Sequence, residues 1–464
     1  MRGRKRTSLA LGRALCAFLA TPPTVYATDL MQVYGQAQAN DAVFESAGFT
    51  LQAAQEKVPQ ARSALLPSLG VNGDTSETRG GTTYTGTPEV TRSYKSYAWT
   101  LQLTQPVFRA EYYEAYDASK ALAEQAVAQY AQAKQDLIVR VAQAYFDVVV
   151  AEEAVDAAAA QVRALNEQQQ AANRSFSGGV ASITDVDDSR SRAALADAQR
   201  VAAVDDLDSK LAALQAITGT EPVALAILDP DATPPNPEPK EVRSWVDEAR
   251  QSNLNVIAAR AAVDAAEFEL KRTQALRLPN VDLIAAYGGN YSSGNIINPS
   301  NYASRVRDGQ VSLQLSMPLL DGGGFKAQVH EARAKHRKAE AELDVAQRQA
   351  ALDARQAYAG VLNGLAQVEA LKAAVAAGAN SVRGNRIGYG LGIRINSDVL
   401  NSEQQLYSAR RDLAKARYDT LLQGLKLKAA AGELGQEDLR AINRMLLMRQ
   451  GSGPVDPNVV PSTN

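Results

Sequence analysis

The chain of 464 residues is 45% hydrophobic and 22% charged, and its formal net charge at pH 7 is -2. That length is sufficient for two or more domains, and the near-neutral charge gives no indication of nucleic-acid binding. With two histidines and one cysteine, the chain has little material for a metal site or for thiol or imidazole catalysis, so we expect no enzymatic activity and no bound metal or cofactor.

Residues 1–27 have the features of a secretory signal peptide. Basic residues precede an apolar run from Leu9 to Ala20, and Val25-Tyr26-Ala27 offers a small-residue cleavage site. Cys16 lies inside this segment, so we expect a mature chain without cysteine, disulfides or a lipid anchor. No later run of about 18 apolar residues follows, so no transmembrane helix is expected.

Residues 28–222 are predicted to hold helices and one strand hairpin, at about 66–108. Residues 99–104 (WTLQLT) alternate apolar and polar side chains, and Pro106 is expected to end the strand. The alternation gives the strand one apolar and one polar face, which fits either a soluble core or a lipid surface.

A long helix is predicted from Glu111 to about Arg174, a stretch without proline. Apolar and small residues recur every three or four positions between Leu137 and Leu165, which is the heptad pattern of a coiled coil. At 1.5 Å per residue this helix is a rod of about 95 Å. Its narrow apolar seam requires partner helices, and a return helix at about 183–217 supplies one after a glycine turn.

The same order of elements recurs at an offset of about 212 to 213 residues, so the chain is predicted to be an internal repeat. The turn FSGGVASITDV, which begins at Phe176, corresponds to YGLGIRINSDV, which begins at Tyr389. A proline-rich linker, residues 223–240, separates the first repeat from the second, residues 241–435, whose strand hairpin is expected at about 278–320.

The two histidines and the C-terminal segment of the second half do not indicate a catalytic or metal-binding site. His330 and His336 lie on a helical face rich in Arg and Lys, at a spacing unlike that of a paired zinc motif, so we expect both at the solvated surface. Residues 436–464 form a C-terminal segment whose tail we expect to be disordered.

Two hairpins give four strands, and four strands cannot close a barrel wide enough for a lumen. Open strand edges are not tolerated in lipid. If the strands enter a membrane, several chains must therefore contribute strands to one closed oligomer.

The chain resembles the TolC family of outer-membrane efflux and type I secretion channels. The most specific motif is the segment from Gly388 to Leu434, GYGLGIRINSDVLNSEQQLYSARRDLAKARYDTLLQGLKLKAAAGEL, supported by ASITDV in the first half. The resemblance covers nearly all of the mature chain. It implies a mainly α fold with a membrane β-barrel: a homotrimer whose α-helical coiled-coil barrel crosses the periplasm and is capped by a barrel of twelve strands, four from each chain.

The function implied by the resemblance is a passive exit duct in the outer membrane of a Gram-negative bacterium, serving a tripartite efflux pump or a type I secretion system. The implied partners are a periplasmic adaptor (membrane fusion) protein, an inner-membrane transporter and outer-membrane lipid. One alternative is a periplasmic coiled-coil scaffold with a soluble β end, which would be extracted without detergent. Another is a diffusion porin, which would leave the long heptad helices unexplained.

The resemblance also implies a network that holds the periplasmic entrance closed, and the matching residues are Thr184, Asp185, Tyr389 and Arg394. Arg394 can form a forked pair with Asp185, and Tyr389 can donate to the same carboxylate. An alternative role for Thr184 and Asp185 is to cap the return helix, and both roles can coexist. Because all partners are present, we expect closed tips.

Two acidic rings in the entrance of the family correspond to Asp398 and Asn401, so one carboxylate is retained and the other is not. A symmetric carboxylate ring favours cations, which makes Asp398 the predicted selectivity residue. Asp188, the first-repeat equivalent of Asn401, is a candidate replacement or a solvated acid at a helix N-terminus. The positions implied to dock the adaptor, which otherwise simply form turns, are Gly179, Val180, Leu391 and Gly392.

Overall fold

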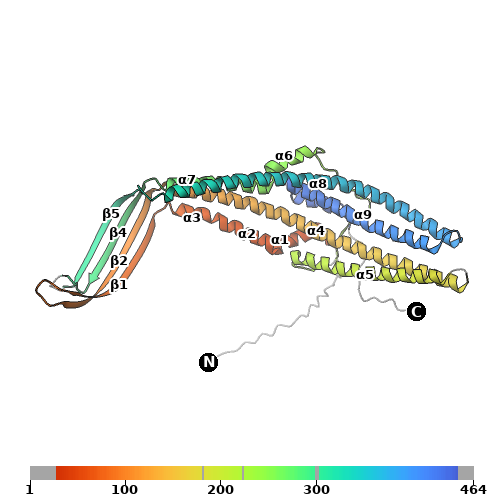
Figure 1. Cartoon of the computed structure of the whole chain (residues 1–464), viewed down its shortest axis with the longest axis horizontal. Helices are drawn as coiled ribbons and strands as arrows, with labels where there is room; N and C mark the ends of the chain where they lie inside the picture. Colours follow the sequence, from red (N-terminus) through yellow and green to blue (C-terminus); the bar gives the residue numbers. More distant parts are fainter. Residues whose placement is uncertain (1–27, 180–181, 222–223, 298–301, 448–464) are drawn as a thin grey trace, which may run out of the picture.

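The computed structural model describes residues 28–179, 182–221, 224–297 and 302–447. The candidate signal peptide, the candidate docking residue Val180 and the tail after residue 447 lie outside these ranges. The molecule is elongated, with a sheet at one end and the turns of two helical hairpins at the other (Figure 1). Within the described part of the chain, no helix combines the length and apolar character needed to cross a membrane.

The sheet has four antiparallel strands in the order β1-β2-β4-β5. Their bounds are β1 Ser68–Thr82, β2 Val90–Phe108, β4 Asn280–Ser292 and β5 Ser304–Ser316. The expectation that Pro106 ends its strand is wrong, since β2 continues to Phe108. The register of β2 against β4 shifts between Pro106 and Phe108. Proline has no backbone N–H to donate to the ladder, and it is tolerated at such a bulge because the regular hydrogen-bond pattern is interrupted there.

Each half of the chain contains one long helix followed by a shorter return helix. The long helices are α4 Ala110–Ser177 and α8 Gly324–Gly390, and the return helices are α5 Ile183–Thr218 and α9 Asn396–Ala430. The predicted rod and its partner are thereby confirmed, and the lengths of 68 and 36 residues in the first half against 67 and 35 in the second confirm the internal repeat. At 1.5 Å per residue, each long helix extends about 100 Å.

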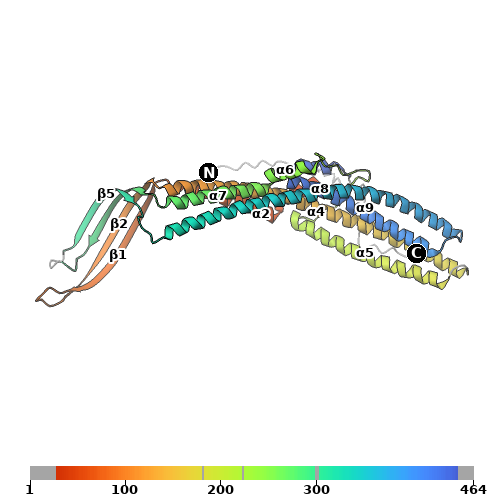
Figure 2. The ribbon, with the colours of Figure 1, turned by 45° about the horizontal axis from the view of Figure 1, so that its top comes forward.

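Shorter helices pack against the ends of the long helices that lie next to the sheet. Helices α2 Ala42–Gln55 and α3 Lys57–Ser63 pack along α4, and α7 Leu254–Ala275 contacts both α4 and α8. Figure 2 shows α7 between the two long helices α4 and α8. The helices therefore form a curved wall that continues from the strands.

The main core lies midway along the rods, where the ends of the chain return to them. Helices α1 Leu30–Asn40 and α10 Gln436–Asn443 and a small sheet of β3 Ile227–Leu228 with β6 Leu446–Leu447 pack there, and α6 Val242–Ser252 lies on α8. The fully buried Tyr145 of α4 donates from its hydroxyl to the Ala226 carbonyl at 2.8 Å. The segment between the repeats is thus fixed against the first long helix.

A buried ion pair holds the junction of α1 and α2 on α4. The Asp41 carboxylate caps α2 by accepting from the Phe44 N–H at 2.7 Å, and it accepts from both terminal nitrogens of Arg140 at 2.9 and 3.0 Å. Hydrogen bonding from the Arg140 guanidinium lowers the pKa of Asp41. Because the folded state holds this pKa below its unfolded value, the pair stabilises the fold above the unfolded pKa and loses its contribution as pH falls through the folded one.

We expect Asp41→Asn to lower stability at neutral pH by about 1.5 kcal/mol, because asparagine still caps a helix but cannot form the ion pair. The difference in thermal unfolding between wild type and variant, measured in detergent by circular dichroism, should be full at pH 7 and shrink below about pH 4. A difference that stays constant down to pH 2 would contradict this account.

Candidate functional site

The two helical hairpins turn in the same way. In the first tip (residues 178–182) the Gly179 N–H donates to the Phe176 carbonyl at 2.9 Å, and in the second tip (residues 391–395) Gly392 does the same to Tyr389 at 3.0 Å. Both glycines have φ of +73°, a conformation that side chains resist. The repeated glycine in the sequence is therefore explained by a repeated turn geometry.

The first tip is closed by a capping box at the start of α5. The Ser182 hydroxyl accepts from the Thr184 N–H at 3.2 Å, and the Asp185 carboxylate accepts from the Ser182 N–H at 3.1 Å. The Thr184 hydroxyl lies 2.7 Å from that of Ser182. Within one chain, Thr184 and Asp185 therefore take the capping role that the sequence also allowed, with Ser182 as the N-cap.

Arg394 and Asp398 lie together in the second tip. The Arg394 guanidinium is 3.6 Å from the Asp398 carboxylate, one helical turn away, and its side-chain stem lies across Gly388. Among the described residues of a single chain, no hydrogen bond or ion pair joins Arg394 to Asp185 or involves the half-buried Tyr389 hydroxyl. The predicted selectivity residue thus carries its own counter-charge.

A polar contact joins the two hairpins at the level of Asp188 and Asn401. Arg192 of α5 donates from Nε to the Asp188 carboxylate at 3.1 Å and from Nη1 to the Asn401 amide oxygen at 2.9 Å. We call these three residues the α5–α9 clasp. Arg192 was not predicted from the sequence, and it brings a positive charge to the position where the resemblance implies a second carboxylate.

A second polar layer lies next to the clasp and is buried. Asn396, which is 2% exposed, donates from its amide to the Ser189 hydroxyl at 2.8 Å and accepts from the Gln168 amide. This layer links α9 to both helices of the first hairpin. An apolar cluster of Leu165, Ala193, Ala196 and Leu400 packs near it, so the two hairpins are joined by apolar as well as polar contacts.

An ion pair between the exposed Arg386 and the buried Glu403 joins α8 to α9 within the second hairpin. Both Nε and Nη2 of Arg386 donate to the same oxygen of Glu403, at 2.9 and 2.6 Å. Glu403 is 1% exposed, and its other carboxylate oxygen has no hydrogen-bond partner within the described residues. Sequence analysis did not single out this pair, although a glutamate among the apolar positions of α9 was visible.

The candidate docking residues that the structure describes lie at the exposed ends of the hairpins. Gly179, Leu391 and Gly392 are all exposed, and the neighbouring Ile393 has 76% of its surface accessible. The second tip therefore presents apolar and glycine surface to the solvent, and the described part of the first tip presents glycine. Throughout the described residues, no group of His, Cys, Asp or Glu has a geometry that could hold a metal ion.

The sheet at the other end has its apolar face outward. At one level of the register, Leu69, Leu103, Ala285 and Val311 lie side by side across the four strands, and the next level, Gly70, Gln102, Ala286 and Gln310, contributes the opposite face. In β2 the large side chains at 97, 99, 101 and 103 are exposed, whereas the residues between them, Ala98, Thr100 and Gln102, are half-buried. A soluble sheet on a core has the reverse arrangement.

Aromatic side chains extend this outward face. Tyr97 stacks on Tyr291 with ring centroids 6.2 Å apart, and Trp99 meets Tyr287 edge-on at 5.7 Å. Exposed tyrosine and tryptophan next to an apolar band are typical of strands that face lipid. The alternation in the sequence is therefore best explained by lipid contact.

Comparisons with known proteins agree with this architecture. The sequence model of the family described as outer membrane efflux protein matches residues 33–220 and 245–433. The proteases secretion protein PrtF of Dickeya chrysanthemi is 32% identical over 422 residues, covering 89% of this chain and 90% of that protein. The outer membrane protein TolC of Escherichia coli strain K12 is 30% identical over 466 residues, covering 99% and 92%.

Solved structures show the same fold. The outer membrane protein VceC of Vibrio cholerae superposes with a TM-score of 0.72 at 20% identity, over 87% of this chain and 96% of that one. CusC superposes with a TM-score of 0.75 at 16% identity, over 88% and 92%.

A strand sheet with an outward apolar face, carried on two long helical hairpins, defines the class of channel-tunnel proteins. The chain belongs to the outer membrane efflux protein family. It is thus an efflux or secretion channel protein of the Gram-negative outer membrane and not an enzyme, and the alternative of a periplasmic scaffold is set aside.

Proposed function

We propose that three copies of this chain form the exit duct of a tripartite efflux pump or a type I secretion system. A signal peptide (1–27) directs export, and the repeats 28–222 and 241–435, joined by the linker 223–240, each contribute one strand hairpin and one helical hairpin. Residues 436–464 complete the C-terminal segment. The twelve pooled strands close a barrel in the outer membrane, and the helices form the periplasmic tunnel.

The observation that carries this proposal is the four-stranded sheet, which is apolar outside and open at both edges. Within the described chain β1 and β5 each pair on one side only, and an open edge in lipid leaves backbone groups unsatisfied at a cost of several kcal/mol each, in order of magnitude. Pairing β5 of one copy with β1 of the next removes both edges.

The free flank of α8 supports assembly from several copies. Ala332 and Ala339 are buried on the side that faces α7, whereas Val345 and Leu352 are 66% and 46% exposed on the opposite side. Their spacing of seven residues is that of a coiled-coil seam without its partner. A neighbouring copy would cover this seam.

The hairpin tips are the proposed gate. Thr184, Asp185, Tyr389 and Arg394 would hold neighbouring hairpins in a closed state, and Asp398 would form the acidic ring. Exposed ion pairs contribute about 0 to 1 kcal/mol each, so the closed state is held weakly. Docking of the adaptor and the transporter breaks these pairs, and the adaptor binds at Gly179, Val180, Leu391 and Gly392. The cargo would be set by that transporter.

Single-channel conductance in a planar bilayer tests the duct and its gate. We expect wild type to show a small, cation-preferring conductance and Arg394→Ser to raise it, because the pair to Asp398 and contacts to neighbouring hairpins are lost. Asp398→Ala should reduce the cation preference. Arg190→Ser, which removes an exposed charge from α5, serves as the control and should change neither property. A wild type without channels would overturn the proposal.

A further inference from the structure

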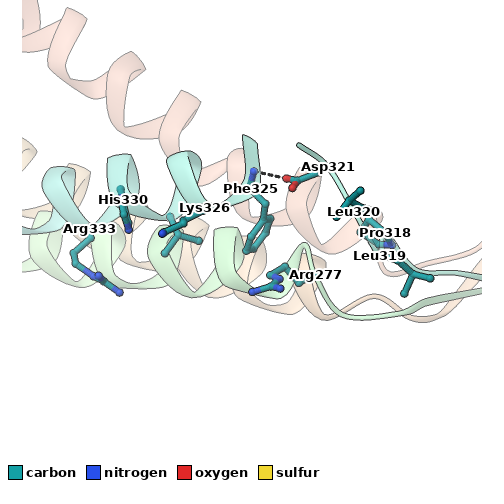
Figure 3. Close-up of a pocket in the computed structure, with 10 residues that line it drawn as sticks. Arg277, Pro318, Leu319, Leu320, Asp321, Phe325, Lys326, His330 and Arg333 are labelled. Atoms are coloured by element: carbon teal, nitrogen blue, oxygen red, sulfur yellow. Dashed lines mark hydrogen bonds between the residues drawn. The ribbon is translucent and has the colours of Figure 1, made fainter. Parts of the chain in front are cut away.

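A basic pocket lies where the sheet joins the helices of the second half. Its volume is about 310 Å³, and it is lined by the loop after β5, the first turns of α8 and the residue Arg277 just beyond α7 (Figure 3). Lys326, His330 and Arg333 project from α8 along the pocket, and Pro318, Leu319 and Leu320 form its end nearest the sheet. All four basic side chains are exposed.

Among the described residues that line this pocket, the basic side chains outnumber the acidic ones. Asp321, its one acidic lining residue, is occupied by the backbone, since its carboxylate accepts from the N–H groups of Gly323 and Phe325. The Arg277 guanidinium lies over the Phe325 ring at 5.0 Å. Among the described residues, Lys326 and Arg333 form no ion pair.

The other flank of the same helix is different. Lys335 pairs with Glu331 at 2.7 Å and Lys338 pairs with Glu342 at 3.2 Å. Near the start of α8, the basic residues without an ion pair therefore lie on the pocket side. The first repeat lacks this feature, because α4 begins with acidic residues instead: Glu111, Glu114 and Asp117.

Helix geometry places the pocket away from the contact between copies. At 3.6 residues per turn, Lys326, His330 and Arg333 lie on average about 140° around α8 from the buried Ala332 and Ala339 that face α7. The exposed seam of Val345 and Leu352 lies about 50° around the helix from His330, about 90° from Lys326 and about 110° from Arg333, and it begins roughly 12 residues, or about 18 Å, beyond Arg333. A neighbouring copy on that seam would leave Lys326 and Arg333 uncovered.

The apolar end of the pocket continues the outward face of the sheet. Leu315 and Met317 are exposed on that face, and Leu319 and Leu320 follow with 86% and 95% of their surfaces accessible. Side chains this apolar and this exposed belong in lipid when they lie beside a lipid-facing strand. The pocket thus combines an apolar rim with cationic groups one to three helical turns farther from the membrane.

We propose that this pocket binds the phosphate headgroup of an anionic phospholipid in the leaflet that faces the periplasm. Lys326, Arg333 and Arg277 bind the phosphate oxygens, His330 adds an N–H donor, and the acyl chains run along Leu319 and Leu320. Basic residues at the membrane boundary attract anionic headgroups in this way. The inference rests on the proposed membrane insertion, and it predicts one site per chain because only the second repeat has the basic stripe.

The test is titration of the purified full-length protein in detergent with phosphatidylglycerol and, separately, phosphatidylcholine, with bound lipid counted by native mass spectrometry. We expect one saturable phosphatidylglycerol per chain and weaker binding of phosphatidylcholine. The affinity of K326Q/R333Q for phosphatidylglycerol should be at least about tenfold lower than that of wild type. K335Q/K338Q removes the same charge from the opposite flank and should bind like wild type.

Equal affinity for both lipids, or equal loss in the two variants, would overturn the site. A wild type that binds no lipid saturably, together with a K326Q/R333Q oligomer that dissociates, would also overturn the site. The basic face would then be a contact between copies of the chain. Planar-bilayer conductance of the same preparations separates the two proposals. Channels without lipid binding overturn only the lipid site, whereas a wild type without channels overturns the proposed duct.

Discussion

Arginine in place of Val311 is expected to prevent this chain from assembling in the outer membrane. Val311 is 74% exposed near the middle of β5, in the apolar register level with Leu69, Leu103 and Ala285. An arginine at the lipid-facing midplane of a barrel costs about 2 to 4 kcal/mol. In the proposed trimer this cost applies three times, so the amount of protein in the outer-membrane fraction and of heat-modifiable oligomer should fall sharply.

The neighbouring position provides a matched control. Gln310 precedes Val311 on the same strand, and its side chain belongs to the opposite, polar face. Gln310→Arg adds the same group to the lumen side and should assemble normally while lowering the cation preference of the channel. If Val311→Arg assembles as well as Gln310→Arg, the outward face does not contact lipid.

The elements that follow from local pattern could be predicted from the sequence. The alternation in residues 99–104 predicts β2, and the small-residue heptads predict α4 and α8, because both patterns report directly on which face of an element is buried. The end of β2 was misplaced because proline is excluded from regular ladders but not from a bulge. That distinction depends on the partner strand.

The candidate site could be predicted only in part, because its contacts depend on how the hairpins pack. The glycine turns are local, and the spacing of Ser182 and Asp185 is a recognisable capping box. The α5–α9 clasp is different, since Arg192 and Asn401 are 209 residues apart and meet only when both hairpins are in place. Correspondence with a family motif directs attention to Asn401 and Asp188 but not to the arginine between them.

Removal of Arg386 is the second change with a large expected effect. Glu403 is buried, and both of its hydrogen bonds from side chains come from Arg386. Arg386→Ala leaves a buried carboxylate without its partner, which costs about 3 to 5 kcal/mol in comparable pairs, and less if water enters beside the half-exposed arginine site. Opening of the α8–α9 hairpin near its tip should therefore become more frequent, with faster hydrogen exchange there and a larger conductance.

A double variant separates the lost pair from the stranded charge. Glu403→Gln in the Arg386→Ala background replaces the carboxylate by a neutral amide of the same shape, so most of the lost protection should return. Arg383→Ala removes an exposed arginine one turn earlier on α8 and controls for helix propensity. If Arg386→Ala exchanges no faster than Arg383→Ala, the pair does not hold the hairpin closed. If the double variant regains protection and Arg386→Ala alone does not, the buried charge of Glu403 is what destabilises the hairpin. A docking partner that draws Arg386 away from Glu403 would then open the tip in the same way.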